Sequence, residues 1–206
     1  MDWGTSESSR VITMSNVNHE YKNIFIHVPK TAGTSMERNK FVGGKAHKTA
    51  KVIKQLVGDS VWDDYFTWGF VRDPLDRILS SFFHEPNITG HSQTREGFQD
   101  FVKEFYRDGI DIPSMLEVGN KYHHHFIPQY YFLCDEKHNI LVEFVGKYSE
   151  LEYDWAEVCN RIGVTTELEH YRKGNYIKDR SMYYDSETEI LVRELYDRDY
   201  KIFERF

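Results

Sequence analysis

A loop in the N-terminal part of the chain combines the residue types that bind a phosphate group. Lys30 brings a mobile positive charge, and three neighbouring hydroxyl side chains bring hydrogen-bond donors. Gly33 lets the backbone come close to an anion because it carries no Cβ. The loop consists of Pro29, Lys30, Thr31, Ala32, Gly33, Thr34 and Ser35. It follows an apolar run and precedes a helix start, where free N–H groups and the helix dipole favour an anion.

The loop differs from a Walker A sequence. That sequence places its lysine directly before the serine or threonine that opens the helix. Here Lys30 precedes Gly33 by three positions. The alternative interpretation is an ordinary turn between a strand and a helix, with the lysine in solvent. The loop alone does not decide between the two.

A second segment has a similar construction. Arg72 directly follows the apolar run Tyr65–Val71, and Ser80 lies about two helical turns further on. Ligands of open α/β sheets bind beyond the carboxyl ends of the strands. Two such corners would suit a ligand with two separate phosphates. The alternative is that Arg72 forms a salt bridge with Asp73 or Asp76.

Hydrophobic patterns predict the elements that hold these residues. The run Asn23–Val28 is short, apolar and ended by proline, as in a buried strand. Tyr65–Val71 has the same character. Asp73 suits the N-cap of the helix that follows, and Pro74 suits its first turn. Because strands alternate with helices, the sequence predicts an α/β fold with a parallel sheet covered on both faces.

The rest of the chain divides into further segments. Residues 1–20 are polar without periodicity and are expected to form a flexible arm, which leaves residues 21–206 as one domain. Residues 84–128 are expected to be loop-rich and to shape a binding site. The other expected elements are a helix after His47 ended by Gly58, a helix near Glu96–Tyr106, strands at Tyr130–Leu133 and Ile140–Phe144, a helix around Trp155–Ile162 and a last helix at Ser186–Phe203.

The composition excludes several classes of protein. The chain has 206 residues, of which 40% are hydrophobic and 29% charged, as in a globular domain. A net charge of -7 gives no basic excess, so no nucleic-acid partner is expected. No apolar run approaches the ~20 residues of a membrane span, so no membrane partner is expected either. Cys134 and Cys159 form no CxxC pair and are expected to be core thiols of a cytoplasmic protein.

Several motifs in order resemble the sulfotransferases, above all the sulfotransferase family 2 group that includes carbohydrate sulfotransferases. His27–Ser35 looks like the 5′-phosphosulfate loop of that family, and Phe70–Ser80 looks like its 3′-phosphate motif. His47–Ala50 is similar to a short histidine motif between the two. Phe144–Leu151 resembles the strand and turn after the acceptor region. The resemblance extends over residues 23–206.

The resemblance implies a fold, a donor and a reaction. The fold would be a P-loop-like central parallel sheet flanked by helices. The donor would be 3′-phosphoadenosine 5′-phosphosulfate, with 3′,5′-bisphosphoadenosine as product. The sulfuryl group would move by in-line displacement to a hydroxyl, less often an amine, of a small molecule or glycan. The family pattern requires no metal.

The resemblance also assigns roles to residues. Lys30 would contact the 5′-phosphate and stabilise the charge on the leaving group. The other members of the loop would hold the 5′-phosphate; they are Thr31, Ala32, Gly33, Thr34 and Ser35. Arg72 and Ser80 would hold the 3′-phosphate. His47 would act as general base on the acceptor hydroxyl, since an unperturbed imidazole pKa near ~6.5 suits proton transfer at neutral pH.

Other roles for the histidines and for a nearby carboxylate stay open. Glu37 is the second candidate for the base, and His47 could instead only cap its helix. The run His123-His124-His125 lacks the i, i+4 spacing of a metal-binding pair on a helix. No metal is therefore expected there, and contact with a substrate or plain surface exposure is expected instead.

Two positions differ from those of a typical member of the family. Lys147 and Ser149 stand where many relatives carry other polar residues, which leaves the adenine contacts undefined. Lys178 and Arg180 could reach the donor from the C-terminal side.

Two other functions stay open. The first alternative function is a nucleotide-dependent phosphotransferase, which would need Mg²⁺ ligands. The second is an inactive module that binds a nucleotide without transferring anything.

Overall fold

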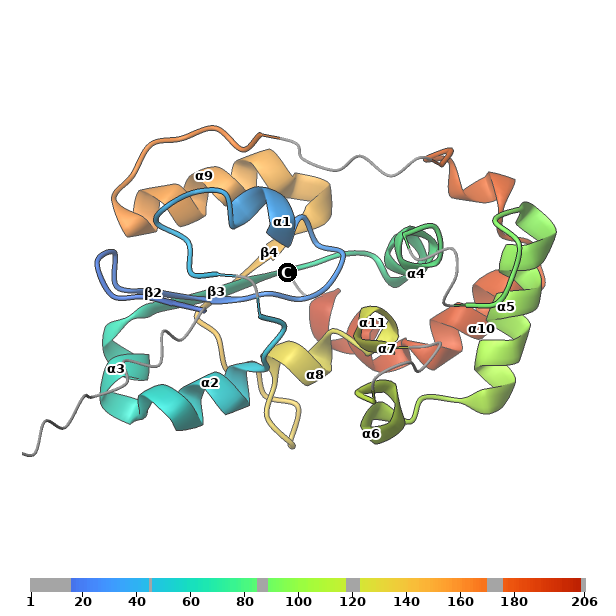
Figure 1. The fold of residues 1–206 in the computed structure, drawn as a ribbon, viewed down its shortest axis with the longest axis horizontal. Helices are drawn as coiled ribbons and strands as arrows, with labels where there is room; N and C mark the ends of the chain where they lie inside the picture. Colours follow the sequence, from blue (N-terminus) through green and yellow to red (C-terminus); the bar gives the residue numbers. More distant parts are fainter. Residues whose placement is uncertain (1–15, 45, 85–88, 118–122, 170–175, 205–206) are drawn as a thin grey trace, which may run out of the picture.

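The computed structural model describes residues 16–44, 46–84, 89–117, 123–169 and 176–204. Within these ranges, four strands form one sheet in the order β1-β2-β3-β4 (Figure 1). They are β1 (Val17–Asn18), β2 (Asn23–Ile26), β3 (Phe66–Val71) and β4 (Phe144–Lys147). Strands β2, β3 and β4 are parallel, and the short β1 runs antiparallel to β2. The α/β class is confirmed, with one antiparallel edge strand that the sequence did not predict.

Helices cover both faces of the sheet, as Figure 1 shows. On one face lie α1 (Gly33–Met36) and α9 (Leu151–Ile162), and on the other lie α2 (Ala50–Val57), α3 (Asp59–Asp64) and α8 (Tyr130–Leu133). Successive side chains of a strand point to opposite faces. Accordingly Ile24 and Ile26 belong to the hydrophobic cluster that includes α2 and α8, whereas Phe25 belongs to the one that includes α9.

The cluster beneath α9 is built from aromatic rings. Phe25 of β2 stacks on Trp68 of β3 with ring centroids 4.4 Å apart. Trp155 of α9 meets the same Trp68 edge to face at 6.2 Å. These contacts fix α9 against the two strands whose ends carry the candidate phosphate-binding residues.

A second group of helices extends the core beyond the carboxyl ends of the strands, on the right of Figure 1. It comprises α4 (Pro74–Phe82), α5 (Arg95–Asp108), α6 (Ile112–Met115), α7 (His123–Phe126), α10 (Ser186–Leu195) and α11 (Asp197–Phe203). The rings of Phe82, Phe101 and Phe126 join α4, α5 and α7, with centroids 5.2 and 5.1 Å apart. The aromatic residues of this region therefore build core.

The helix caps that the sequence predicts are present. Asp73 caps α4 by accepting hydrogen bonds from the N–H groups of Leu75 and Asp76, and Pro74 occupies the first turn. Gly58 ends α2 with a φ angle of 78°. Asp73 and Pro74 thus place the N-cap of α4 directly after Arg72.

Two predicted strands near the middle of the chain are wrong. Tyr130–Leu133 forms helix α8, and Ile140 makes only an isolated bridge to Cys134 before β4 begins at Phe144. An apolar run of four residues fits a strand or a buried helical turn equally well. The choice depends on tertiary contacts, because the N–H of Tyr130 is bound by the carboxylate of Asp199, far along the chain.

The predicted last helix is interrupted. Residues 186–203 form α10 and α11, separated at Tyr196, whose backbone has φ −111° and ψ 20°. The hydroxyl of Tyr196 donates to the carbonyl of Phe126 at 2.5 Å, which fixes the break against α7.

The N-terminal segment joins the fold before the expected boundary at residue 21. Asn16 is buried, and its side-chain amide donates to the carbonyls of Phe25 and Ala46. Residues 1–15 of the predicted arm lie outside the described residues.

The two cysteines lie in the core as expected. Both are free and buried. Burial raises the pKa of Cys134 to about 12, so its thiol stays protonated at neutral pH. In the part of the chain that the structure describes, no helix has the length and apolar character needed to cross a bilayer.

The aromatic cluster beneath α9 predicts a stability difference within one helix. Trp155 is 2% exposed and Tyr153 is 78% exposed. Trp155→Ala should lower the free energy of unfolding by ~3–5 kcal/mol because it opens a cavity against Trp68. Tyr153→Ala should change it by less than ~0.5 kcal/mol. Urea unfolding of both variants measures the difference, and equal effects would contradict the packing described.

Candidate active site

The loop after β2 has an uncommon backbone conformation. Lys30 and Ala32 have φ angles of 70° and 69°, in the left-handed region that residues other than glycine rarely adopt. Left-handed residues in such turns direct N–H groups into a concavity that binds anions. In the described chain, no protein acceptor takes a backbone hydrogen bond from the N–H groups of Thr31, Ala32, Gly33 and Thr34. The loop therefore offers several backbone donors to a ligand.

The hydroxyl groups of the loop are not equivalent. Thr31 is fully buried, and its Oγ1 donates to the carbonyl of Val28 at 2.8 Å. That hydroxyl closes the loop on itself, so the backbone N–H is the donor that Thr31 offers to an anion. Ser35 is buried as well, whereas Thr34 and Lys30 are partly exposed.

His27 explains why glycine stands at position 33. A Cβ on Gly33 would lie 2.0 Å from Nε2 of His27, so no other residue fits without moving the imidazole. On the opposite side of the ring, Nδ1 lies 2.6 Å from Oε1 of Glu37, with side chains that are 7% and 6% exposed. Glu37, the second candidate base, is thus engaged in a buried pair with His27.

His47 lies beside the start of the loop and is partly exposed. Its Nδ1 lies 2.9 Å from the carbonyl oxygen of His27. A carbonyl oxygen only accepts, so Nδ1 carries the proton and Nε2 is left as an acceptor. Thr49 is the residue whose side chain caps α2, so His47 does not act as the cap.

Burial sets the charge of His47. Burial, with the electrostatic effect of His27 as a smaller cause, lowers the pKa of His47 to about 3, against the opposing effect of the hydrogen bond to the His27 carbonyl. The imidazole is therefore neutral at pH 7. The ordinary imidazole pKa assumed from the sequence therefore does not apply to His47, because the sequence does not reveal that this side chain is largely buried.

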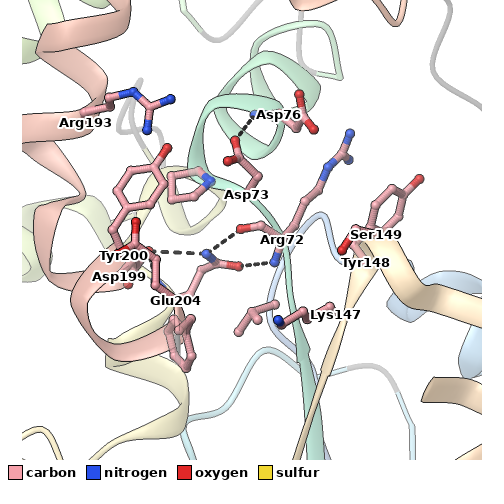
Figure 2. Close-up of a pocket in the computed structure, with 14 residues that line it drawn as sticks. Arg72, Asp73, Asp76, Lys147, Tyr148, Ser149, Arg193, Asp199, Tyr200 and Glu204 are labelled. Carbon is pink, nitrogen blue, oxygen red and sulfur yellow. Dashed lines mark hydrogen bonds between the residues drawn. The ribbon is translucent and has the colours of Figure 1, made fainter. Parts of the chain in front are cut away.

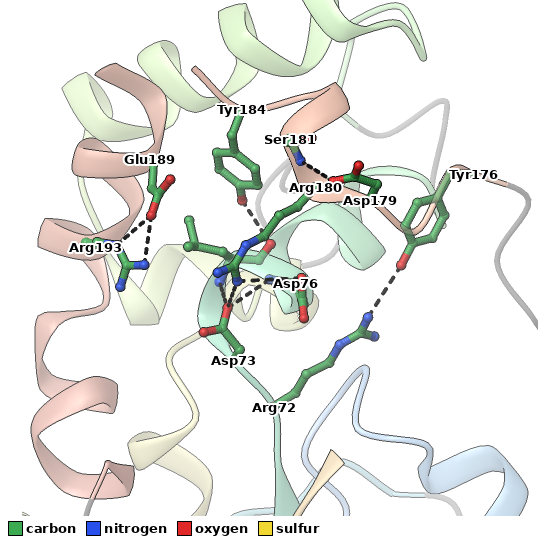
Figure 3. A network of polar contacts seen from close by, with 11 residues as sticks. Arg72, Asp73, Asp76, Tyr176, Asp179, Arg180, Ser181, Tyr184, Glu189 and Arg193 are labelled. Carbon is green, nitrogen blue, oxygen red and sulfur yellow. Dashed lines mark hydrogen bonds and ion pairs between the residues drawn. The ribbon is translucent and has the colours of Figure 1, made fainter. Parts of the chain in front are cut away.

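Arg72 reaches from the end of β3 to the loop after β2. Its Nη1 donates to the carbonyl of Lys30 at 3.4 Å, and its guanidinium lies over the ring of Tyr148 at 4.2 Å. In the described residues it forms no ion pair with Asp73 or Asp76. Those carboxylates face Arg180 instead, at 3.2 and 3.9 Å (Figure 3). The salt-bridge alternative for Arg72 is therefore wrong.

Tyr176 connects Arg72 to Ser80, a role that no pattern in the sequence indicates. Nη2 of Arg72 donates to the hydroxyl of Tyr176 at 3.5 Å (Figure 3). The ring of Tyr176 stacks on that of Phe83. Burial by itself would raise the pKa of Tyr176, but the charge of Arg72 and a hydrogen bond with Ser80 lower it on balance. The two residues expected to hold one phosphate are thus neighbours around this hydroxyl.

Lys178 and Arg180 have other partners in the structure. Nζ of Lys178 lies over the ring of Tyr176, 4.3 Å from its centroid. Arg180 is bound to Asp73, as described above. Arg180 therefore braces the start of α4, and a direct contact of either residue with the donor stays a prediction.

Gln129 holds the backbone of Arg72 in place. Its Oε1 accepts from the N–H of Arg72 at 2.8 Å, and its Nε2 donates to the carbonyl of Arg72 at 2.8 Å. The N–H of Gln129 in turn donates to the buried carboxylate of Asp199 at 2.9 Å. A side chain near α8 therefore continues the hydrogen bonding of β3 beyond its last residue.

Arg77 ties the loop to the segment before α8. It is fully buried on α4, with Nε donating to the carbonyl of Pro29 at 3.0 Å and Nη2 to that of Ile127 at 2.7 Å. Because it spans these carbonyls, the loop cannot shift without breaking a buried, charge-assisted hydrogen bond.

A cavity of about 310 Å³ opens beside Arg72, between the ends of β3 and β4 and helix α11 (Figure 2). Lys147, Tyr148 and Ser149 line one side. Arg72 lines the cavity and also contacts the loop, but none of the residues that line the cavity comes from 29–35. The positions where the sequence departs from the family pattern therefore lie at a cavity next to Arg72.

Comparison with known proteins decides the family. A profile described as the sulfotransferase family matches residues 13–205. The chain belongs to the sulfotransferase family. This sulfotransferase is 26% identical over 192 residues to carbohydrate sulfotransferase 14 of Danio rerio, covering 78% of the chain and 52% of that protein. The match thus spans about half the length of this relative.

A second relative is uncharacterized. It is a protein of Archaeoglobus fulgidus that is 25% identical over 121 residues, which cover 58% of the chain and 86% of that protein. No solved structure gives a significant match. The resemblance seen in the sequence is confirmed, and family membership implies sulfuryl transfer.

The clamp on Arg72 predicts a measurable loss of stability. Gln129→Met keeps the size of the side chain but removes both hydrogen bonds to the Arg72 backbone. Unfolding in urea should become easier by ~1–3 kcal/mol, the cost of leaving buried polar groups unpaired. Gln55→Met, at an exposed position of α2, is the matched control and should change stability by less than ~0.5 kcal/mol. Equal stability of the two variants would show that the clamp is unimportant.

Proposed function

We propose that this sulfotransferase uses 3′-phosphoadenosine 5′-phosphosulfate as donor and transfers its sulfuryl group to a hydroxyl. The observation that carries the proposal is the position of Arg72. Its guanidinium lies between the loop after β2 and the Tyr176–Ser80 pair, without a carboxylate partner in the described residues. Its Nε is buried and has no hydrogen-bond partner there. A partly buried cation so placed suits a phosphate.

The residues present fit a donor with two phosphates. The N–H groups of residues 31–34 would hold the 5′-phosphate, and Lys30 would add a positive charge beside it. Arg72 and Ser80 would hold the 3′-phosphate, with Tyr176 as a further donor. When bound, the donor supplies a sulfuryl group joined to the 5′-phosphate. Fixed positive charge and backbone donors would stabilise the negative charge that develops on that phosphate as the bond breaks.

His47 is the base in this proposal. Its protonated Nδ1 is held by the carbonyl of His27, which leaves the Nε2 lone pair to accept the proton of the acceptor hydroxyl. The acceptor oxygen forms a bond to sulfur, the bond from sulfur to the phosphate oxygen breaks, and its electron pair stays on the phosphate. Burial makes the imidazolium unfavourable in the free protein. Negative charge on the bound donor would offset that cost.

One named relative and the net charge bear on the class of the acceptor. One relative is named a carbohydrate sulfotransferase, which supports a glycan or other hydroxyl-bearing acceptor. The net charge of -7 does not favour a highly anionic polymer. Transfer of labelled sulfate from the donor to a panel of glycans and hydroxyl-bearing metabolites, with amines as the comparison, identifies the class.

The phosphate contacts predict binding defects. Lys30→Ala and Arg72→Ala should each weaken binding of 3′,5′-bisphosphoadenosine by ~10- to 100-fold, because a hydrogen bond to a charged group contributes ~1.5–3 kcal/mol. Lys40→Ala, at an exposed position outside the loop, should bind as the wild type does. Calorimetry without added metal measures all three. Unchanged affinity in Arg72→Ala would refute the two-phosphate site.

The role of His47 predicts that binding and turnover separate. His47→Ala should bind 3′,5′-bisphosphoadenosine within a few-fold of the wild type but lose ~10²–10⁴-fold in transfer rate, the range of general base catalysis. His19→Ala, at an exposed position on the surface, should retain the rate. Full transfer by His47→Ala would remove this residue as the base.

Two other outcomes would favour the alternatives. Magnesium-dependent turnover of ATP would support a phosphotransferase. Tight binding of 3′,5′-bisphosphoadenosine without transfer to any acceptor would support an inactive nucleotide-binding module.

A further inference from the structure

Three histidines from distant parts of the chain meet beside the candidate active site. They are His47, which precedes α2, and His124 and His125 of α7. One ring nitrogen of each lies within 4.8 Å of those of the other two. The ring centroids of His47 and His124 are 4.9 Å apart, and those of His124 and His125 are 4.4 Å apart.

This spacing is close to that of a tetrahedral zinc site. Zn–N bonds of 2.0–2.1 Å place two ligand nitrogens of a tetrahedral ion roughly 3.3 Å apart. Rotations of the imidazole rings that move the nitrogens by about an ångström would bring the three nitrogens to that separation. Three histidines with a fourth position open to water form a common donor set for Zn²⁺, and imidazole also suits Cu²⁺ and Ni²⁺.

His47 already has the outer contact that metal-binding histidines use. Such a histidine donates its second ring N–H to a carbonyl or carboxylate, which fixes the ring and leaves the other nitrogen for the metal. Nδ1 of His47 makes this contact with the carbonyl of His27. His27 is itself paired with Glu37, so a carboxylate stands behind the site. His47 and His124 are partly exposed, which gives an ion access from solvent.

We propose that His47, His124 and His125 form a binding site for a divalent transition-metal ion, with Zn²⁺ as the preferred ion. The site has a consequence that rests on the proposed function. Nε2 of His47 has one lone pair, so it binds the metal or accepts the proton of the acceptor hydroxyl, but not both. Zn²⁺ is therefore a reversible inhibitor of sulfuryl transfer.

A titration with Co²⁺ tests the site without any assay of activity. Tetrahedral Co²⁺ absorbs visible light strongly, and Zn²⁺ should displace it. The wild type should give this spectrum, and His124→Ala and His47→Gln should bind at least tenfold more weakly. His19→Ala is the matched control, because His19 is exposed and contacts Tyr65 rather than the three histidines. This variant should bind Co²⁺ as the wild type does. Equal binding by wild type and His124→Ala would overturn the site.

Thermal unfolding controls for variants that lose Co²⁺ binding only because they misfold. Zn²⁺ should raise the melting temperature of the wild type and of His19→Ala but not that of His124→Ala, because binding to the native state stabilises it. If Zn²⁺ raises the melting temperature of His124→Ala equally, the three-histidine site is wrong.

The inhibitory role needs its own measurement. Zn²⁺ should reduce transfer by the wild type, and a chelator should restore it. The residual transfer of His124→Ala should resist at least tenfold more Zn²⁺. Co²⁺ binding in a protein that does not bind 3′,5′-bisphosphoadenosine would refute the proposed function and leave the metal site standing. Normal binding of the nucleotide without a Co²⁺ spectrum would refute the metal site and leave the proposed function standing.

Discussion

The parallel pairing of β2 with β3 is the constraint on which the site depends. Ile26 of β2 pairs with Gly69 of β3, so both strands deliver their next residues to the same edge of the sheet. A Cβ at Gly69 would lie 2.8 Å from a methyl group of Leu133 and 3.0 Å from the carbonyl of Ile26. The glycine thus lets α8 pack closely where the two strands end. One strand then leads into the loop and the other into Arg72, which is why residues so far apart in sequence can share a ligand.

Buried polar contacts stabilise that edge from the side of the C-terminal helices. Asp199 of α11 binds the N–H groups of Gln129 and Tyr130, and Gln129 binds the backbone of Arg72. Arg77 adds a link from α4 to the loop. Because these contacts are buried or partly buried, leaving a partner unpaired costs free energy. The geometry of the loop and of Arg72 therefore depends on side chains of α11 and α4 and on Gln129, none of which belongs to the loop itself.

The sequence predicts the parts of the site that local rules determine. The loop at 29–35, the position of Arg72 after a buried strand and the Asp73–Pro74 start of α4 all follow from residue types and spacing. The roles of Tyr176 and Gln129 were not predicted, because they arise from contacts between distant parts of the chain. The helix at Tyr130–Leu133 was predicted as a strand for the same reason.

The histidines show the same limit in the electrostatics. The ordinary pKa of imidazole led to the expectation of a base poised near neutrality, whereas burial lowers the pKa of His47 to about 3. The adjacent run at 123–125 lacked metal-binding spacing, yet the fold brings His47 to it. Burial and long-range proximity are tertiary properties, so no pattern within either segment could have indicated them.

The central claim is that two phosphate positions, one at the loop and one at Arg72, bind a single donor. Calorimetry of the wild-type protein with 3′,5′-bisphosphoadenosine and with adenosine 5′-monophosphate, both in the presence of a metal chelator, tests it most directly. The ligand without a 3′-phosphate should bind at least ~10-fold more weakly, because it leaves the partly buried guanidinium of Arg72 without its anion. Equal affinity for the two nucleotides would contradict the account.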